Sequence, residues 1–571
     1  MKLFKNIKKW LENQEHLFYL FLFILIVPNI VLCFTEPLSF IAKVCNVLLP
    51  FGCYYLLMTL SRNCGKMLWI LFLFLFFGAF QIVLLYLFGQ SIIAVDMFLN
   101  LVTTNSSEAM ELLGNLTPAI VVVVILYIPA LVLATISIVR KRMLSAAFIR
   151  RERKRAFVVF GVSLLSLAGA YVQDPGYELK SDLYPLNVCY NVGLAFQRTA
   201  LTQNYHHTSK DFTFHAQATH PEEKQEVYVM VVGETSRALN WQLYGYERET
   251  NPLLVQQSGL VAFPKVLTES NTTHKSVPML LSDVTACSYD SIYHRKGIIT
   301  AFKEAGFRTA FFSNQRFNHS FIDFFGREAD TFDFIKEDSL DFSYNPSDNE
   351  LLKLVEQEVE QELAKGAKKQ FIVLHTYGSH FNYRERYPSG DAFFTPDYPV
   401  EAERKFRDNL VNAYDNSVRY TDSLLARLIG MLENQGTDAA LIYTSDHGED
   451  IFDDPRHLFL HASPVPSYYQ LHIPFLIWMS DSYREAYPEH WEAVTANKEK
   501  NISSSSSFFP TMLDLGGIKT PYRDDSQSVA TPLYKMRPRV YLNDHNEPRP
   551  LDDLGMKKQD FHMLEKQEIN T

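Results

Sequence analysis

The N-terminal third of the chain contains five long apolar runs, each near the ~20 residues that a helix needs to cross a bilayer. They cover about residues 16–34, 41–60, 67–89, 118–139 and 156–172. A soluble helical core would rarely show such runs five times within 175 residues, so we predict five membrane-spanning helices. Residues 90–116 are too polar to span. Two readings stay open for them, an amphipathic helix near the outer membrane boundary or a plain loop.

The pattern changes after residue 175. Residues 176–225 look irregular and hold many aromatic and histidine residues, which predicts a connector along the membrane surface. From residue 226 onward, short apolar runs at 226–234, 308–314, 370–378, 439–448 and 474–480 alternate with amphipathic stretches, of which 350–366 and 412–436 are the clearest. This alternation predicts an α/β domain over 226–571 whose mostly parallel sheet is covered on both faces. In such folds, ligands bind beyond the carboxyl ends of the strands.

Charge divides the chain at the same place. The 571 residues carry a net charge of −10, but residues 1–175 carry +7, and the remainder carries −17 together with 16 of the 17 histidines. The split excludes a single soluble globule. The acidic larger part has no basic run, which argues against nucleic acid as the main partner.

Basic residues in the first part set an orientation. They gather in the N-terminal arm and between residues 140 and 155, whereas residues 90–117 hold no Lys or Arg. The positive-inside rule then places these basic segments in the cytoplasm and everything after about residue 173 on the far side. No A-x-A-like site follows the first run, so we interpret it as an anchor and not as a cleaved signal.

Polar residues cluster where the predicted strands end. Glu234 closes the first strand, His375 and His380 lie at and beyond the end of the third, and Asp446 and His447 follow the fourth. Two carboxylates and an imidazole at one sheet edge predict a metal site, with Glu234, Asp446 and His447 as ligands. The ligand types suit catalytic zinc, which keeps one position for substrate or a nucleophile, and manganese is the competing metal.

Several serine and threonine hydroxyls in residues 268–284 are candidates for a catalytic nucleophile. They precede a short apolar helix that we expect to start near Val277–Pro278. From the residues alone, these hydroxyls could be helix caps or could lie where a helix N-terminus holds a phosphate. The candidates are Ser270, Thr272, Thr273 and Ser276.

Five motifs carry a family resemblance, at residues 231–246 (VVGETSRALNWQLYGY), 271–282 (NTTHKSVPMLLS), 375–380 (HTYGSH), 444–449 (TSDHGE) and 459–464 (FLHASP). With the apolar runs, they make the chain resemble the lipid A phosphoethanolamine transferases of the alkaline phosphatase/sulfatase superfamily. The resemblance implies Thr273 as the nucleophile, with Thr272 as its main competitor, and a zinc ion bound by Glu234, Thr273, Asp446 and His447. It also implies that His380 and His461 contact the phosphoryl group or assist proton transfer, with His375 and Glu449 in support.

The same resemblance implies a bacterial inner-membrane protein with several spans and a periplasmic catalytic domain. The donor would be phosphatidylethanolamine, and the acceptor would be lipid A or another envelope glycan. The chain departs from the well-known members at Glu269 and Met279, which stand where those members carry paired cysteines, so we expect the outer domain to lack that disulfide.

Three other functions were weighed. A glycerophosphate transferase resembling lipoteichoic acid synthases, with a phosphatidylglycerol donor and often manganese, is the main alternative. A membrane sensor with a degenerate enzyme domain would be favoured by broken ligand positions, and none is broken. A sulfatase activity is disfavoured because the chain lacks the C/S-x-P-x-R motif that formylglycine formation requires.

Overall fold

The computed structural model describes residues 10–89, 91–103, 116–336 and 344–570. Its contacts divide these residues into two compact units. The first contains residues 10–98 and 116–196, and the second contains residues 99–103 and 197–570. The sequence-based limits of the membrane domain, the connector and the catalytic domain, at residues 175 and 225, stay predictions.

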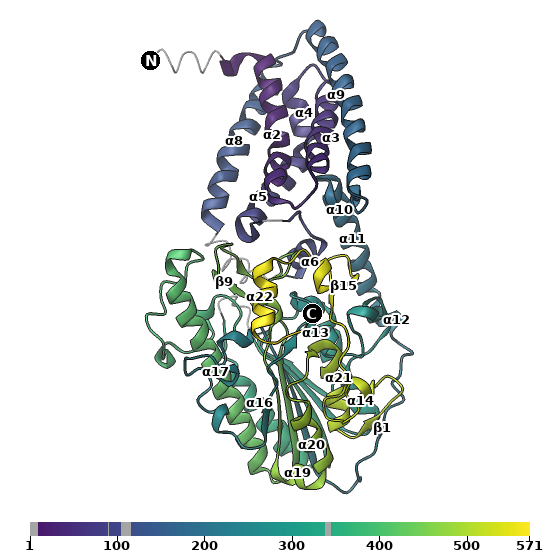
Figure 1. Ribbon diagram of the computed structural model, residues 1–571, viewed down its shortest axis with the longest axis vertical. Helices are drawn as coiled ribbons and strands as arrows, with labels where there is room; N and C mark the ends of the chain where they lie inside the picture. Colours follow the sequence, from purple (N-terminus) through teal and green to yellow (C-terminus); the bar gives the residue numbers. More distant parts are fainter. Residues whose placement is uncertain (1–9, 90, 104–115, 337–343, 571) are drawn as a thin grey trace. The chain divides into compact units, whose positions relative to one another are not determined.

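Four helices of the first unit are long and apolar enough to cross a membrane, namely α2 (Gln14–Thr35), α3 (Phe40–Met58), α8 (Thr117–Val139) and α9 (Ala146–Gln173). A fifth span is formed only if α4 (Cys64–Ile70) and α5 (Phe72–Phe88) are counted together (Figure 1). The five predicted apolar segments thus correspond to these four long helices and the bent pair.

The third predicted span is not one helix, because α4 and α5 are bent by 62° at Leu71. No glycine or proline occurs between residues 66 and 77 to mark this break. Tertiary packing accounts for the position of α4, since a Cβ atom on Gly65 would lie 2.3 Å from the carbonyl oxygen of Ala134 in α8. Such close backbone contact between helices needs glycine on one side.

The fifth span begins ten residues earlier than predicted. Helix α9 starts at Ala146, and the Ser145 hydroxyl caps it by accepting a hydrogen bond from the Phe148 N–H group at 3.0 Å. The basic residues 150–155 therefore lie in the first turns of a helix and not in a loop. Within residues 90–116 the structure has one helix, α6 (Val95–Thr103), and residues 90 and 104–115 lie outside the described residues.

The prediction of an irregular segment over 176–225 is wrong. This segment contains α10 (Leu179–Asp182), α11 (Leu186–Gln203), α12 (Tyr205–Thr208) and β1 (Gln217–Ala218). The buried positions Asn187, Asn191, Ala195 and Arg198 recur every three or four residues along α11. This is the spacing of a helical stripe, but its polar members hid it from a reading of hydrophobic positions.

A seven-stranded sheet forms the centre of the second unit, in the order β3-β11-β8-β2-β7-β5-β6. The strands β2, β5, β6, β7 and β8 are mutually parallel, and β11 runs antiparallel to both of its neighbours. The mostly parallel sheet and all five predicted strands are thus confirmed. The strand bounds are β2 (Glu226–Gly233), β3 (Leu260–Ala262), β5 (Arg308–Ser313), β6 (Thr331–Phe334), β7 (Lys369–His375), β8 (Asp438–Ser445) and β11 (Phe475–Met479).

Both faces of the sheet are covered, and β2 shows how. Val227, Val229 and Val231 belong to a core cluster with α16 (Asn349–Ala364) and α17 (Arg407–Asn434). Tyr228 and Met230 belong to a second cluster, which includes α13 (Thr273–Leu280), α14 (Ile298–Glu304) and α21 (Ser504–Leu515) (Figure 1). Since alternate side chains of a strand point to opposite faces, every position of β2 is buried.

The remaining elements surround this sheet. The other helices of the second unit are α15 (Phe321–Gly326), α18 (Tyr468–Leu471), α19 (Asp481–Ala486), α20 (Pro488–Asn497) and α22 (Lys558–Lys566). Four small two-stranded sheets pair β1 with β13 (Ile518–Lys519), β4 (Val266–Leu267) with β12 (Ile502–Ser503), β9 (Asp450–Ile451) with β10 (Phe459–Leu460), and β14 (Val540–Leu542) with β15 (Pro548–Pro550).

Candidate metal centre and nucleophile

Strand pairing brings the two predicted carboxylate ligands together. The parallel strands β2 and β8 are neighbours, and Gly233 of β2 is paired with Ser445 of β8. The residues that follow, Glu234 and Asp446, therefore leave the same sheet edge side by side. The Asp446 N–H group donates to the Gly233 carbonyl at 3.1 Å, which extends the pairing by one residue.

Glu234, Asp446 and His447 form a compact group in which one ligand atom from each lies within 4.8 Å of the others. His447 Nε2 is 3.2 Å from Asp446 Oδ2 and 3.5 Å from Glu234 Oε1. All three side chains are buried. His447 Nδ1 lies 3.0 Å from the Gly448 carbonyl oxygen and donates to it, so Nε2 is the nitrogen left to bind a metal.

The burial of two carboxylates close together favours the binding of a cation by this group. Burial, together with the nearby charge of Asp446, raises the pKa of Glu234 to about 8. Burial likewise raises the pKa of Asp446 to about 7, although the N–H groups of Thr235 and His447 donate to its Oδ1 at 3.1 and 2.8 Å. A divalent cation would offset the cost of burying two carboxylates, and the oxygen and nitrogen donors fit zinc.

Thr273 is the first residue of α13, and its hydroxyl lies against this group. Thr273 Oγ1 is 3.1 Å from His447 Nε2 and 3.3 Å from Glu234 Oε1. Of the other candidate hydroxyls, Ser276 Oγ donates to Asp446 Oδ2 at 3.1 Å, and Thr272 Oγ1 lies 3.1 Å from Ser270 Oγ.

The prediction that the helix starts near Val277–Pro278 is wrong, because α13 begins at Thr273 and contains Pro278. Proline favours the first turn of a helix, which suggested the later start. Because the helix starts earlier, Thr273 lies in its first turn and not in a preceding loop. Backbone N–H groups at a helix N-terminus favour the binding of a phosphoryl group.

Two of the predicted histidines lie beside the metal group. The His461 ring centre is 4.2 Å from that of His447 and 5.9 Å from that of His380. His461 Nδ1 lies 3.3 Å from Glu449 Oε1, while His380 Nδ1 donates to the Phe381 carbonyl at 2.7 Å. Burial holds the pKa of His380 well below its ordinary value. The structure therefore brings His380, His461 and Glu449 to one side of the site.

His375 has a different environment. It is the last residue of β7, and its Nδ1 lies 3.1 Å from Ser313 Oγ of the neighbouring strand β5. Burial lowers its pKa to about 3. Its hydrogen bond is thus made within the sheet and not with the metal group.

Sequence reasoning missed several residues that hold the site together. Gln315 donates to Glu234 Oε2 at 3.1 Å, and it lies two residues after the end of β5, a position that could have indicated it. Asn271 Nδ2 donates to the Ser463 carbonyl at 2.8 Å, which ties the loop of His461 to the segment before the nucleophile. No local pattern identifies Asn271, because its partner is 192 residues away.

The Sulfatase family model matches residues 226–518, which is more than half of the chain. The chain therefore belongs to the sulfatase family. The matched range holds the sheet and every residue of the candidate site.

Within that family, the chain is similar to phosphoethanolamine transferases, and the resemblance drawn from its motifs is confirmed. It is 28% identical over 322 residues to phosphoethanolamine transferase EptA of Salmonella typhimurium, an alignment that covers 55% of this chain and 57% of that relative. The chain thus spans little more than half the length of the curated relatives it matches.

Two solved structures extend the comparison. The C-terminal periplasmic domain of EptC from Escherichia coli in complex with Zn superimposes with a TM-score of 0.54 at 25% identity, covering 60% of this chain and 97% of that one. Lipooligosaccharide phosphoethanolamine transferase A (EptA) from Neisseria meningitidis, an integral membrane protein, has a TM-score of 0.68 at 21% identity and covers 90% of this chain and 97% of that one. The latter match shows that the fold of apolar helices followed by a sulfatase-like domain is shared.

Proposed function

We propose that this protein transfers phosphoethanolamine from phosphatidylethanolamine to lipid A or another envelope glycan through a covalent intermediate on Thr273. The observation that carries the proposal is the position of Thr273 Oγ1, 3.1 Å from His447 Nε2 and 3.3 Å from Glu234 Oε1, at the N-terminus of α13. The relatives named as phosphoethanolamine transferases supply the group that is transferred.

Glu234, Asp446, His447 and Thr273 would hold a zinc ion. When bound, zinc would lower the pKa of the Thr273 hydroxyl and stabilise negative charge on the phosphoryl oxygens. The Zn complex of the related EptC domain supports zinc over manganese. Gln315 and Ser276, which donate to Glu234 Oε2 and Asp446 Oδ2, orient the two carboxylates.

In the first step, Thr273 Oγ1 loses its proton to solvent and attacks, as the alkoxide, the phosphorus atom of phosphatidylethanolamine. The bond from Thr273 Oγ1 to phosphorus forms, and the bond from phosphorus to the glycerol oxygen breaks. Diacylglycerol leaves with a proton from His461, whose charged form is stabilised by Glu449 at 3.3 Å. His380, which burial keeps neutral and whose Nδ1 donates to the Phe381 carbonyl, can accept a hydrogen bond through Nε2.

In the second step, an acceptor hydroxyl or phosphate oxygen attacks the same phosphorus atom. The new bond to the acceptor forms, and the bond to Thr273 Oγ1 breaks and leaves the alkoxide. His461 regains its proton from the acceptor hydroxyl, or from solvent where a phosphate oxygen is the acceptor. The N–H groups at the start of α13 offset charge on the phosphoryl oxygens in both steps.

The experiment is intact-mass spectrometry of the full-length protein after incubation with phosphatidylethanolamine vesicles and zinc. We expect a phosphoethanolamine adduct on the wild type and on Thr272→Ala, but none on Thr273→Ala. Glu234→Gln should lose bound zinc while keeping its fold. An adduct on Thr273→Ala would refute the assignment, and an adduct of glycerophosphate mass, formed from phosphatidylglycerol, would establish the alternative donor.

We also propose that the protein is a multi-pass inner-membrane protein with its catalytic domain in the periplasm. The alternation of basic and uncharged segments supports this orientation. A reporter fused at residue 145 should be cytoplasmic, and one fused at residue 220 should be exported. The opposite pattern would exclude a donor lipid in the outer leaflet.

A further inference from the structure

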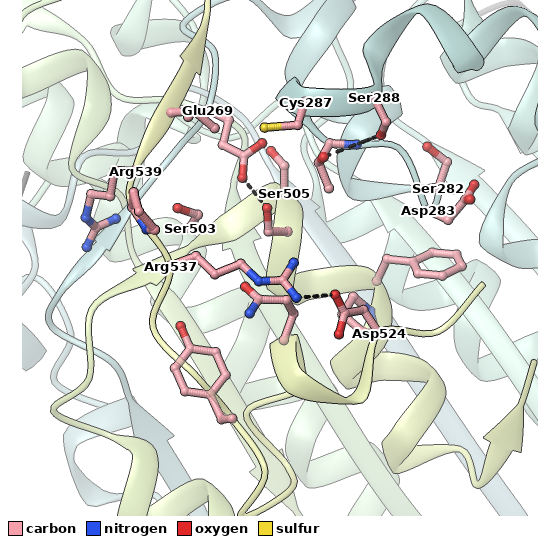
Figure 2. A pocket seen from close by; sticks show the side chains of 18 of the residues that line it. Glu269, Ser282, Asp283, Cys287, Ser288, Ser503, Ser505, Asp524, Arg537 and Arg539 are labelled. Atoms are coloured by element: carbon pink, nitrogen blue, oxygen red, sulfur yellow. Dashed lines mark hydrogen bonds and ion pairs between the residues drawn. The ribbon is translucent and has the colours of Figure 1, made fainter. Parts of the chain in front are cut away.

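The second unit contains a separate polar pocket of about 290 Å³ that the proposed reaction does not use (Figure 2). Its walls come from the segment after α13, from the N-terminal turn of α21 and from residues 537–540. Thr273 begins α13 and one pocket wall follows the end of this helix, so with a rise of 1.5 Å per residue that wall lies about 10 Å along the helix from the nucleophile.

Hydroxyl and amide groups dominate the lining of this pocket, with apolar rings and aliphatic groups between them. The polar side chains include Ser282, Ser288, Ser503, Ser505, Asn501 and Gln527. Phe509, Pro538 and Val540 supply apolar surface. A ligand that fits such a lining has several hydrogen-bonding groups and at least one apolar face.

Two polar atoms at this pocket are buried without a hydrogen-bond partner among the residues that the structure describes. They are Oγ of Ser505, whose side chain is only 2% exposed, and Oδ1 of Asp283. Figure 2 shows Ser505 near the middle of the group and Asp283 at its edge. Buried polar atoms normally have partners, so these two indicate a ligand that can donate to a carboxylate and either donate to or accept from a hydroxyl.

The helix α21 adds donors on the same side. It is twelve residues long, and the hydroxyl of its N-cap residue, Ser503, makes no capping hydrogen bond. N–H groups in the first turn of such a helix can donate to a ligand oxygen. Together with Ser505 in that turn, they provide donors close to the unpartnered hydroxyl.

Charge argues against a simple anion in this pocket. Arg537 lines the pocket, but its Nη2 atom already donates to Asp524 Oδ2 at 2.6 Å (Figure 2). The guanidinium of Arg539 is engaged by backbone carbonyls, among them that of Ile502 at 2.6 Å. Glu269 and Asp283 bring two carboxyl groups to the wall, and Asp283 Oδ2 is already paired with Arg295 Nε at 3.4 Å. Carboxyl groups at the wall disfavour a phosphate or sulfate.

A neutral ligand rich in hydroxyl groups satisfies all of these conditions. We propose that the pocket binds a saccharide ring, whose hydroxyls pair with Ser505 and Asp283 and whose apolar face packs against Phe509. The volume of the pocket suits one or two sugar rings. This inference stands apart from the proposed transferase activity, because it rests on the pocket alone and its test involves no turnover.

Cys287 offers a direct measurement of occupancy. Its thiol is exposed and lines the pocket. The full-length protein, held in a detergent without a sugar headgroup, is alkylated with iodoacetamide, and the modification of each cysteine is followed by peptide mass spectrometry. D-glucose, D-galactose and N-acetyl-D-glucosamine are the probes, inorganic phosphate is the anion control, and the exposed Cys189 is the internal control.

We expect at least one of the three sugars to slow alkylation of Cys287 while leaving Cys189 unchanged. At a concentration of about ten times Kd, mass action predicts a rate about tenfold lower. Ser505→Ala should raise that Kd about fivefold, the equivalent of one hydrogen bond. Ser504→Ala is the matched control, because its hydroxyl is also buried and unpartnered among the described residues but does not line the pocket.

Three results would overturn the proposal. They are no protection by any of the sugars, protection by phosphate alone, and sugar protection that neither Ser505→Ala nor Asp283→Ala weakens. Asp283→Ala removes the unpartnered Oδ1 atom, and Ser505→Ala removes the unpartnered Oγ atom. With two variants, the test does not depend on the folding of a single mutant.

Discussion

The buried ion pair between Arg237 and Asp453 yields a sharp prediction about the loops of the site. The Arg237 side chain is 2% exposed, and its Nη1 atom donates to Asp453 Oδ2 at 2.6 Å and to the Glu449 carbonyl at 3.1 Å. Its Nε atom donates to Asn240 Oδ1 at 2.6 Å. Arg237 therefore joins the segment after β2, which carries Glu234, to the segment that carries His447.

We expect Arg237→Met to destabilise the second unit by about 3 kcal/mol. Removing one partner of a buried ion pair costs about 3–5 kcal/mol, because the other charge is left uncompensated. The lower figure applies here, since Asp453 keeps the Ile451 N–H group at 2.8 Å and Arg407 at 3.4 Å. For a unit of this size, about 2 °C per kcal/mol corresponds to a fall in Tm of about 6 °C.

The assay is thermal unfolding of the full-length protein in detergent, followed by tryptophan fluorescence at a fixed scan rate. Trp241 and Trp478 are fully buried in the second unit and report its unfolding. Arg549→Met is the matched control. Its partner is Glu547, and both side chains are about half exposed, so the loss should stay below about 1 kcal/mol.

The double variant Arg237→Met/Asp453→Asn tests the reasoning itself. It removes both charges, so it should be less destabilised than the sum of the two single variants predicts. Additive losses would mean that the two residues do not act as a pair. A Tm for Arg237→Met within about 1 °C of the wild type would refute the estimated cost.

Two further predictions follow from local geometry. Gly378→Ala should lower the amount of bound zinc and the activity, because the new Cβ atom would lie 2.6 Å from the Glu234 carbonyl oxygen at a φ of +51°. The control Gly436→Ala, with a φ of +65° and no atom within 4 Å of the new Cβ, should strain the backbone similarly but leave zinc bound. Metal content is measured by mass spectrometry, and equal zinc loss in the two variants would contradict the prediction. Burial raises the pKa of Glu226, but the His220 ring at 2.8 Å, Lys369 at 3.3 Å and the Tyr487 hydroxyl together outweigh it and hold that pKa below its ordinary 4.5. Glu226→Gln should therefore be less stable than the wild type above pH 4.5, and the difference should shrink as pH falls through the lower folded pKa; a difference that grows on acidification, measured by denaturant unfolding, would contradict this.

The metal ligands could be predicted because they depend on the simplest rule of the fold. Adjacent parallel strands end at one edge, so the residues after Gly233 and Ser445 must meet. The strands themselves are continuous apolar runs, which sequence reveals well. Thr273 was harder to choose, because four hydroxyls share the segment and only the start of α13 decides which of them faces His447.

Features that depend on distant partners could not be predicted. The break at Leu71 lies in an unbroken apolar run, and nothing in that run marks it. Helix α11 buries two asparagines and an arginine, so its buried stripe is only partly hydrophobic and is hard to recognise in the sequence. Arg237 and Asn271 act through residues about 200 positions away. In each case tertiary contacts decide the outcome, and local preference carries no information about them.

Glu269, which stands where the well-known members carry one of the paired cysteines, forms hydrogen bonds in place of the disulfide. Its carboxylate accepts hydrogen bonds from the Ala286 N–H group at 2.8 Å and from the Ser506 hydroxyl. It therefore connects the segment before Thr273 to the segment after α13 and to α21. Hydrogen bonds to a charged group contribute about 1.5–3 kcal/mol each, comparable to the 2–4 kcal/mol of a disulfide. Unlike a disulfide, this link weakens if the carboxyl takes up a proton, and burial already raises the pKa of Glu269. The nucleophile is thus held at both ends of its helix without a covalent bond, at the cost of a connection that acid can loosen.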